Sequence, residues 1–554
     1  MSRFFSAAIL VTALCAAAAV PASAGRTQES IVMDDAHIVY VTPEQLDANF
    51  AELKAIGVDR VRVSVYWRLI APASEQKQRP NFDAGNPAAY PPEHWDRYDA
   101  IVAAAQKHRL GLLFSITGPA PLWATGTPDR SDIEATYDPN ADEFREFVRA
   151  VGTRYSGSYR AEVAAPPPEQ ECDLLGCREE QQETPPGELL GRVDHWSVWN
   201  EPNHPGWLTP QWLPDPRNPA LPMLPAAARI YRGLTDAAFA GLEASGHGGD
   251  VILLGETAPR GLNDRGVTRA IRPLEFIREL YCLDRRFRPF QGEAAQVRGC
   301  PGTRDAFVAQ HPVFFRGTGW AHHPYALEQR PDRGDRRRDN VVLADMDRLT
   351  RELDRIFRVH GQSRRLPIWL TEYGYQTDPP DPTIGVSWSR QAAYLNHAEY
   401  LSYSNPRIAS SAQFLLFDDG PLMEFQSSDP RHWGTFQSGL KTNAGREKRS
   451  YTSYQRPIHV SPARVRRGRA VRVFGQLRSA PNGRRLSARL QYRSTRSRRY
   501  RTIKRLTVRN RRGYVLTRTR PRTSGYYRIV WRDPGTGKSL TTRRVRVGVS
   551  RPRR

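Results

Sequence analysis

Two glutamates that each follow a short apolar run are the residues of this sequence best suited to proton transfer and nucleophilic attack. Glu201 lies in VWNEPNH (198–204), and Glu372 lies in IWLTEYG (368–374). A buried strand that ends just before such a residue presents the carboxylate at the start of a loop, where binding and catalytic groups gather. Hydrolysis of an acetal needs one carboxyl group that delivers a proton and another that meets the positive charge developing on carbon. The pair therefore predicts acetal-cleaving chemistry.

The sequence around these glutamates alternates between helix-like and strand-like segments from residue 28 to residue 440. A first helix is expected to begin at Thr42, because Thr42 can cap it, Pro43 suits its first turn and Gln45 completes a capping box. Gly57 is expected to end this helix. The β-branched and aromatic run 61–67 that follows predicts a strand.

Eight such strands are expected, at 31–33, 61–67, 110–116, 193–198, 251–255, 319–323, 367–371 and 412–417. Their alternation with helices predicts an α/β fold, a (β/α)8 TIM barrel with insertions. A doubly wound open sheet is the alternative, but no Gly-x-Gly-x-x-Gly turn follows the first strand and no P-loop is present in the sequence. Glu201 would end the fourth strand and Glu372 the seventh, so both are expected at the C-terminal face of the barrel.

The motif Trp199-Asn200-Glu201-Pro202-Asn203, followed by Thr371-Glu372-Tyr373-Gly374, resembles the clan A (4/7 superfamily) retaining glycoside hydrolases. It is most similar to families 39 and 5, and the likeness covers residues 30–455. The resemblance implies hydrolysis of O-glycosidic bonds of a poly- or oligosaccharide by double displacement. Glu201 would be the general acid and then the base, and Glu372 the nucleophile. Retention, which the clan implies, corresponds to carboxyl groups about 5 to 5.5 Å apart. We expect neither a cofactor nor a metal ion.

Four further positions match the clan, and some have a structural alternative. Asn200 matches the asparagine that binds the sugar 2-hydroxyl. Arg62 resembles the arginine beside the nucleophile, where its charge would keep Glu372 ionised; an ion pair at the surface or at the end of the barrel is the alternative. His323 and Tyr325 match the element whose tyrosine hydroxyl bonds the nucleophile, and a purely structural Tyr325 is the alternative.

The sequence also departs from the clan pattern. The third strand runs into Ser115-Ile116-Thr117-Gly118-Pro119 without the histidine found in many family 5 members, and the eighth strand, 414–419, lacks the usual tryptophan. Trp123 or Trp433 could replace that tryptophan, because a sugar ring stacks on an aromatic side chain from any loop; core packing is the alternative for each. Because of these departures, the sequence does not fix which sugar is bound, which anomer is cleaved, whether cleavage is exo or endo, or which glycoside hydrolase family the chain resembles most.

A third carboxylate, Glu256, ends the fifth strand. We expect it either to bind a sugar hydroxyl or to pair with Arg260, and we rank it behind Glu201 and Glu372 for chemistry.

The C-terminal segment 457–554 has a different composition. From Ser461 onward it has 31 lysines and arginines against one acid, Asp533, whereas the whole chain has 82 against 58. Short alternating runs split by turns predict a small all-β, Ig-like sandwich. Its charge predicts binding of an anionic cell-wall polymer or acidic polysaccharide. Nucleic acid is disfavoured because no nucleic-acid-binding motif accompanies the charge. An Ig-like spacer with a solvated arginine-rich face is the alternative.

The first 24 residues predict a signal peptide, with a catalytic domain at 25–456. Cys15 within this leader leaves a lipid anchor as an alternative. The four other cysteines allow two disulfides, and we favour Cys172–Cys177 and Cys282–Cys300 among the three connectivities. No later stretch reaches the roughly 20 apolar residues of a membrane span. We expect a secreted or cell-surface protein, and a monomer.

Two non-enzymatic hypotheses compete with the glycosidase. The first is a carbohydrate- or cell-wall-binding protein on a barrel scaffold, which would be favoured if Glu201 or Glu372 turned away from the cleft. The second is a polyanion-binding protein whose barrel only supports the basic segment. Deletion of 461–554 would separate the second hypothesis from an enzyme, because an enzyme would lose binding but keep hydrolysis.

Overall fold

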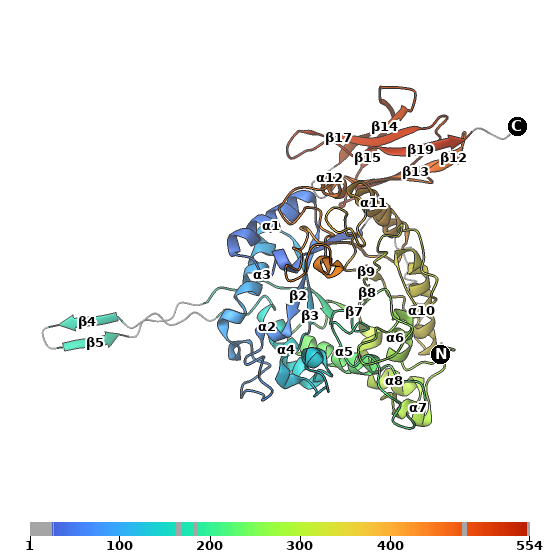
Figure 1. Cartoon of the computed structure of the whole chain (residues 1–554). Helices are drawn as coiled ribbons and strands as arrows, with labels where there is room; N and C mark the ends of the chain where they lie inside the picture. Colours follow the sequence, from blue (N-terminus) through green and yellow to red (C-terminus); the bar gives the residue numbers. More distant parts are fainter. Residues whose placement is uncertain are drawn as a thin grey trace, which may run out of the picture.

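A computed structural model describes residues 25, 27–161, 169–173, 176–180, 187–478 and 485–550 of the chain. It has two parts, a barrel of alternating strands and helices and a C-terminal pair of β-sheets that lies against the barrel (Figure 1). The expected signal peptide, 1–24, lies outside the described residues.

The barrel is an eight-stranded parallel sheet with the order β10-β1-β2-β3-β6-β7-β8-β9. It closes through a parallel bridge between Ile368 and Ile408, beside β9 and β10. The predicted (β/α)8 barrel is therefore confirmed. Its strands are β1 (Glu29–Met33), β2 (Arg60–Tyr66), β3 (Gly111–Thr117), β6 (His195–Val198), β7 (Val251–Thr257), β8 (Gly319–His322), β9 (Ile368–Leu370) and β10 (Ser410–Phe414).

Helices cover the outside of this sheet (Figure 1). The longer ones are α1 (Pro43–Ile56), α3 (Asp96–His108), α4 (Ala141–Arg154), α5 (Ala226–Ala244), α6 (Pro273–Leu280), α10 (Met346–Val359), α11 (Trp388–Ser404) and α12 (Arg449–Gln455), and α2 (Trp67–Ile70) is a single turn. The predicted start of α1 is confirmed: Thr42 and Gln45 form the capping box, and Gly57 ends the helix at a φ of 86°. Among the described residues, no helix combines the length and the apolar character that crossing a bilayer would need.

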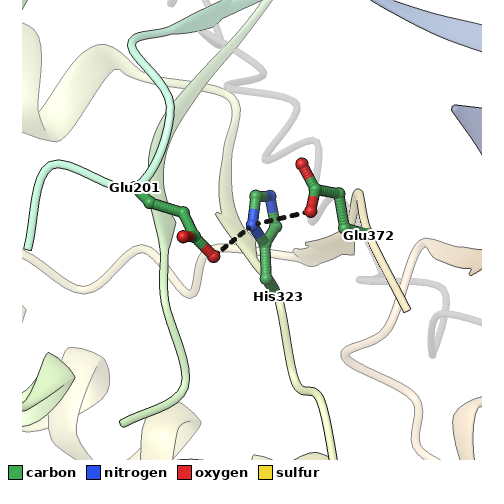
Figure 2. Close-up of side chains that lie close together, drawn as sticks. All are labelled: Glu201, His323 and Glu372. Atoms are coloured by element: carbon green, nitrogen blue, oxygen red, sulfur yellow. Dashed lines mark hydrogen bonds and ion pairs between the residues drawn. The ribbon is translucent and has the colours of Figure 1, made fainter. Parts of the chain in front are cut away.

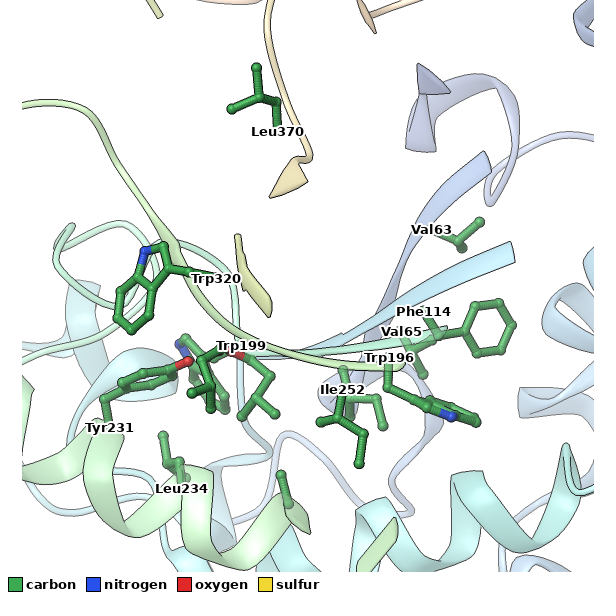
Figure 3. Packing of buried hydrophobic residues seen from close by; sticks show 14 of the residues in the cluster. Val63, Val65, Phe114, Trp196, Trp199, Tyr231, Leu234, Ile252, Trp320 and Leu370 are labelled. Atoms are coloured by element: carbon green, nitrogen blue, oxygen red, sulfur yellow. Dashed lines mark hydrogen bonds between the residues drawn. The ribbon is translucent and has the colours of Figure 1, made fainter. Parts of the chain in front are cut away.

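The barrel core has two layers. Inside the sheet, one buried cluster joins Ile31, Leu113, Leu253, Ala321 and Trp369 from five strands. Outside it, strand side chains pack against the helices. Figure 3 shows part of this outer layer, with Val63, Val65, Phe114, Trp196, Ile252, Tyr231 and Leu234. Tyr231 of α5 also donates its hydroxyl to Val198 O (3.0 Å) and accepts from the Gly255 N–H (2.8 Å), which fixes β6 and β7 to the same helix.

Two insertions interrupt the barrel. The longer one contains α7 (Gly292–Gln296), α8 (Arg304–Gln310) and α9 (Val313–Arg316), and the predicted disulfide Cys282–Cys300 is confirmed there with an S–S distance of 2.05 Å. The other includes the hairpin of β4 (Glu169–Asp173) and β5 (Gly176–Glu180), in which Cys172 lies opposite Cys177 in the register. The side chains of this hairpin are outside the described residues, so the second predicted disulfide stays a prediction.

The C-terminal part is all β, as predicted. A three-stranded sheet, β11-β13-β16, packs on a larger sheet with the order β12-β19-β17-β14-β15, to which β18 adds beside β17. The strands are β11 (Ile458–Ser461), β12 (Arg464–Arg466), β13 (Val471–Gln476), β14 (Leu486–Ser494), β15 (Arg501–Val508), β16 (Tyr514–Thr519), β17 (Gly525–Arg532), β18 (Ser539–Thr541) and β19 (Val545–Ser550).

The three-stranded sheet faces the barrel. Phe474 and Tyr514 pack on Tyr400 and Tyr403 of α11, and the buried Arg478 pairs with Glu399. The larger sheet therefore has its outer face turned away from the barrel (Figure 1).

Candidate active site

A cavity of about 640 Å³ opens at the C-terminal end of the barrel strands, and both predicted glutamates line it. Such a volume falls within the roughly 300 to 1,000 Å³ of sites that enclose one small molecule. The lining residues are Met33, Asp35, Ala36, Tyr40, Tyr66, Asn200, Glu201, His204, Trp207, Ala258, Pro259, Arg260, Tyr325, Leu327, Glu372, Gly374, Gln376, Ile384, Phe414, Leu415, Asp419, Phe436 and Ser438. Most of them follow the carboxyl ends of the strands, as the barrel fold requires.

Glu201 is held by a strained turn directly after β6. Trp199 and Glu201 have φ angles of 62° and 37°, in the left-handed region that residues other than glycine rarely adopt. Backbone hydrogen bonds hold the turn, from the Trp199 N–H to Ile116 O (2.9 Å) and from the Glu201 N–H to Glu256 O (3.0 Å). Strain of this kind costs about 1 to 3 kcal/mol and persists where the surroundings impose it, often at functional sites.

Glu372 follows β9 and is held through its carboxylate. The Tyr325 hydroxyl donates to Oε2 (2.9 Å), and Nη1 of Arg62 lies 3.3 Å from Oε1. Only 7% of Glu372 is exposed, and Arg62 is fully buried. Tyr325 and Arg62 thus lie beside Glu372, where the resemblance placed them.

His323 lies between the two glutamates (Figure 2). Its Nδ1 is 2.9 Å from Oε1 of Glu201 and 3.5 Å from Oε2 of Glu372. One carboxylate oxygen of each glutamate and a ring nitrogen of His323 all lie within 4.8 Å of one another. Two carboxylates this close can act on opposite sides of one bond.

Burial and neighbouring charges shift the pKa values of these three groups in different directions. Burial lowers the pKa of His323, but the charges of Glu372 and Glu201 and the bond to Glu201 raise it overall. Burial raises the pKa of Glu201, but the hydrogen bond and the charge of His323 lower it overall. Burial also raises the pKa of Glu372, and the charges of His323 and Arg62 oppose this rise without cancelling it.

Arg62 is the centre of a buried network below the cavity. It donates through Nε to Oε1 of Glu256 (2.8 Å) and through Nη2 to Oε2 of Glu256 (2.5 Å) and Oδ1 of Asn200 (2.7 Å). Ser115 also donates to Glu256 (2.7 Å). Burial raises the pKa of Glu256, but the charge and hydrogen bonds of Arg62, together with the charge of His323 and the bond from Ser115, lower it overall.

The predicted pair of Glu256 with Arg260 is corrected by this network. Glu256 does not pair with Arg260, which instead bonds Asp335 (3.0 Å) and Tyr325 O (3.0 Å). Glu256 is fully buried and is not among the residues that line the cavity. Its role is to hold Arg62.

Asn200 lines the cavity beside Glu201 and is 2% exposed. Its backbone N–H donates to Oγ1 of Thr117 (3.0 Å), and its side-chain oxygen accepts from Arg62. The amide nitrogen of Asn200 is thereby oriented as a donor toward a ligand.

The predicted sugar-stacking tryptophans are not brought into the cavity. Trp123 donates to Pro72 O (3.0 Å) and packs edge-on against Trp67, and Trp433 packs against His432; neither belongs to the lining. The aromatic wall comes instead from Trp207, which stacks with Tyr66 at 6.4 Å, and from Tyr40 beyond it.

Sequence reasoning missed this wall, although one signal for it was present. Trp207 follows Glu201 by six positions in the same loop. For finding aromatic residues that line the cavity, closeness in sequence to Glu201 is a better guide than residue type alone.

Glu201, His323 and Glu372 are also the group in the described part of the chain whose spacing would suit a metal ion. The fixed positive charge of Arg62, 3.3 Å from Glu372, disfavours a second cation at this position.

No family model matches the sequence, and a search of curated proteins finds no match. Similar solved structures include a family 39 glycoside hydrolase from Bacteroides cellulosilyticus WH2, with 14% identity, 90% of this chain and 82% of that chain covered, and a TM-score of 0.43. A glucosidase from Croceicoccus marinus has 11% identity and a TM-score of 0.45, and the match covers 90% of this chain and 93% of that chain. A family 1 β-glucosidase from Thermotoga maritima has 11% identity and a TM-score of 0.41, and the match covers 74% of this chain and 85% of that chain. All three are glycosidases.

Proposed function

We propose that this protein is an exported retaining glycoside hydrolase that cleaves O-glycosidic bonds by double displacement. The observation that carries the proposal is the facing pair Glu201 and Glu372, which lie in one cavity with carboxylate oxygens within 4.8 Å. Because neither glutamate turns away from the cavity, a non-catalytic carbohydrate-binding barrel is the weaker hypothesis.

In the first step, a carboxylate oxygen of Glu372 attacks the anomeric carbon while Glu201 protonates the departing oxygen. In the second step, Glu201 takes a proton from water, which attacks the same carbon and releases Glu372. Arg62 and the Tyr325 hydroxyl stabilise the Glu372 carboxylate, and Asn200 presents its amide nitrogen to a sugar hydroxyl.

Cleavage requires the proton on Glu201 and an ionised Glu372. Nδ1 of His323 offers the route, since it lies 2.9 Å from one carboxylate and 3.5 Å from the other. A sugar hydroxyl that donates to Glu372 stabilises its ionised form, and exclusion of water beside Glu201 stabilises its protonated form. Substrate binding therefore moves the proton to the acid.

Glu201→Gln tests this assignment, because the loss of a general acid depends on the leaving group. For alkyl or disaccharide substrates, kcat/KM is expected to fall about 10²- to 10⁴-fold. For a 2,4-dinitrophenyl glycoside of the same sugar the fall should be under tenfold, since this phenol leaves without protonation. Kinetics on a panel of glycosides measures both values, and NMR of the first product reports its anomer.

Equal losses on both leaving groups would contradict the acid role of Glu201. A first product of inverted configuration from the wild type would contradict double displacement.

We also propose that the C-terminal domain binds an acidic polysaccharide through its outer face. The arginine face consists of nine exposed or half-buried side chains. Eight lie on β12, β19, β17, β14 and β15, and Arg544 directly precedes β19: Arg464, Arg466, Arg489, Arg493, Arg505, Arg528, Arg532, Arg544 and Arg546. Arg528 stacks on Tyr500 at 3.9 Å, and Arg493 lies between Tyr500 and Tyr526. Stacking fixes the guanidinium planes, which bind carboxylates or sulfates in pairs of hydrogen bonds.

The test is binding of the full chain to polygalacturonate, with neutral dextran as the reference polymer. A triple variant, Arg489→Ser, Arg528→Ser and Arg546→Ser, is expected to bind polygalacturonate about tenfold or more weakly. The matched control, Arg351→Ser, Arg358→Ser and Arg365→Ser near α10, removes the same charge from the barrel and should change binding under twofold. Equal weakening by both variants, or tighter binding to single-stranded DNA, would overturn this assignment.

Export rests on the leader at 1–24 and agrees with the Cys282–Cys300 disulfide, since such bonds persist mainly in oxidising compartments.

A further inference from the structure

The cavity wall beside Glu201 is apolar. It is built by Trp207 from the loop after β6, Ala258 and Pro259 from the loop after β7, and Leu327 from the loop after β8. These loops follow the strand of Glu201 and the next two strands in the barrel order. We call Trp207, Ala258, Pro259 and Leu327 the apolar wall.

Few polar groups interrupt the apolar wall. The guanidinium of Arg260 is already bonded to Asp335 and to Tyr325 O, and Nδ1 of His204 accepts from the Gly206 N–H (3.2 Å). Trp207 could stack with a sugar ring or with an apolar group, but the side chains of Ala258, Pro259 and Leu327 offer neither a ring face nor a hydrogen-bonding group. A sugar unit placed against these three residues would lose hydrogen bonds with water and regain few, which costs free energy.

The opposite side of the cavity is different. Asp35 follows β1, Gln376 follows β9, and Asp419 and Ser438 follow β10, and all four line the cavity. Apolar side chains, among them Ile384 and Phe436, occur there too. Asp35 already accepts from the Tyr66 hydroxyl (2.9 Å) and Asp419 from the Phe436 N–H (3.2 Å), but a carboxylate has further lone pairs that can accept from a sugar hydroxyl. The cavity therefore has one side suited to a sugar and another suited to an apolar group.

Leu327 is the most telling residue of the apolar wall. It is 47% exposed, and its φ of 52° lies in the left-handed region, where a bulky residue is a rare outlier. Core packing does not explain an exposed leucine, and asparagine or glycine would fit this backbone with less strain. A strained, exposed leucine at the mouth of a catalytic cavity points to contact with a ligand.

We infer that the substrate is a glycoside whose leaving group is apolar, an alkyl or aryl alcohol, and not a sugar chain of the kind expected from the sequence. This inference rests on the proposed hydrolase function. Glu201 must protonate the departing oxygen, so the leaving group lies along the wall beside Glu201. An apolar leaving group gains by displacing water from Trp207, Pro259 and Leu327.

The test compares leaving groups on one sugar. A panel of 4-nitrophenyl glycosides first identifies the sugar, and kcat/KM is then measured for its methyl, benzyl and octyl glycosides and for a disaccharide. Methanol and octanol have similar acidity, so the two glycosides should differ little in the intrinsic rate of bond cleavage. A difference in kcat/KM then reports binding of the alkyl chain. Wild type is expected to prefer octyl over methyl about tenfold or more, the factor given by burying two or three methylene groups. The benzyl glycoside distinguishes an aromatic from an aliphatic leaving group.

Leu327→Asn is the informative variant, because asparagine suits the left-handed backbone and the fold should be retained. It is expected to reduce the octyl-to-methyl ratio about fivefold or more. The matched control, Ile384→Asn, changes a mouth residue of similar exposure, 38%, on the sugar-binding side. Ile384→Asn should leave the octyl-to-methyl ratio of kcat/KM within twofold of the wild-type ratio, even if it changes both kcat/KM values.

The outcomes separate the two proposals. No turnover of any glycoside in the panel would overturn the hydrolase function and this inference with it. Turnover with a preference for the disaccharide over the octyl glycoside, or with an octyl-to-methyl ratio that Leu327→Asn leaves unchanged, would overturn this inference alone.

Discussion

Glu372→Gly is expected to lower kcat on an aryl glycoside by about 10⁴-fold or more, the scale on which hydrolases lose activity when a covalent nucleophile is removed. Sodium azide should restore turnover, because azide can enter the space left by the carboxylate and attack the anomeric carbon. The C–N bond then forms as the C–O bond breaks, and the phenolate leaves. A single displacement inverts the configuration, so the glycosyl azide should have the anomer opposite to the substrate.

The control for this experiment is azide with Glu201→Gln. There Glu372 still forms the glycosyl-enzyme, azide attacks in the second step, and the product should keep the configuration of the substrate. Rates are measured by phenol release and anomers by NMR. Activity of Glu372→Gly within tenfold of wild type, or the same azide anomer from both variants, would remove Glu372 from the nucleophile position.

The strands and the two main glutamates could be predicted because their signals are local. A strand such as β2 is marked by a β-branched and aromatic run within 61–67, and α1 by residues within one turn of Thr42. Once the strands are counted, a parallel barrel brings every carboxyl end to one face. Glu201 and Glu372 then meet although 171 positions separate them.

The partners of buried charges could not be predicted in this way. Glu256 has Arg260 four positions away in sequence, but its partner is Arg62, 194 positions away. Strand registry and side-chain direction decide such pairs, and neither is encoded near Glu256. The sequence left Trp123 and Trp433 open for a related reason: a tryptophan has the same local signature in a core as at a sugar site, and only packing distinguishes the two.

The same network makes the ionised state of the buried carboxylates depend mainly on one side chain, Arg62. Glu256, Glu372 and Glu201 lie within reach of the guanidinium of Arg62 and of His323, whose pKa the nearby carboxylates raise. The charge of Arg62 is permanent, whereas that of His323 depends on its proton. Arg62 therefore stabilises the buried carboxylates at every pH at which they are ionised.

Arg62→Met is expected to lower the free energy of unfolding by about 3 to 5 kcal/mol at pH 7, because it leaves the buried Glu256 without its charge partner. Activity should be lost as well, since the pKa of Glu372 would rise further without the nearby guanidinium. Denaturant unfolding of both proteins at several pH values measures the difference, and kinetics on an aryl glycoside measures the loss of activity.

The pH dependence has a definite sign. In wild type the pKa of Glu256 is lowered from 4.5, so the stability it contributes is present above that value and is lost as the pH falls. In Arg62→Met we expect the pKa of Glu256 to be raised above that of the unfolded chain. Burying its carboxylate then lowers the free energy of unfolding at any pH at which the unfolded carboxyl is ionised, above about pH 4.5. Below that pH the carboxyl is protonated in both states, and this loss of stability disappears. The stability difference between the two proteins should therefore be smaller at pH 4 than at pH 7.

Two control variants separate charge from packing. Arg62→Met with Glu256→Gln removes the unpaired carboxylate and should recover part of the stability, but no activity, because Glu372 still lacks its cation. Arg60→Met lies on the same strand at the other end of the barrel, where Arg60 pairs with the partly exposed Glu29 (2.8 Å); it should cost less stability and leave activity unchanged. A stability difference for Arg62→Met that stays constant from pH 4 to pH 7 would show that lost packing, not unpaired buried charge, is the cause.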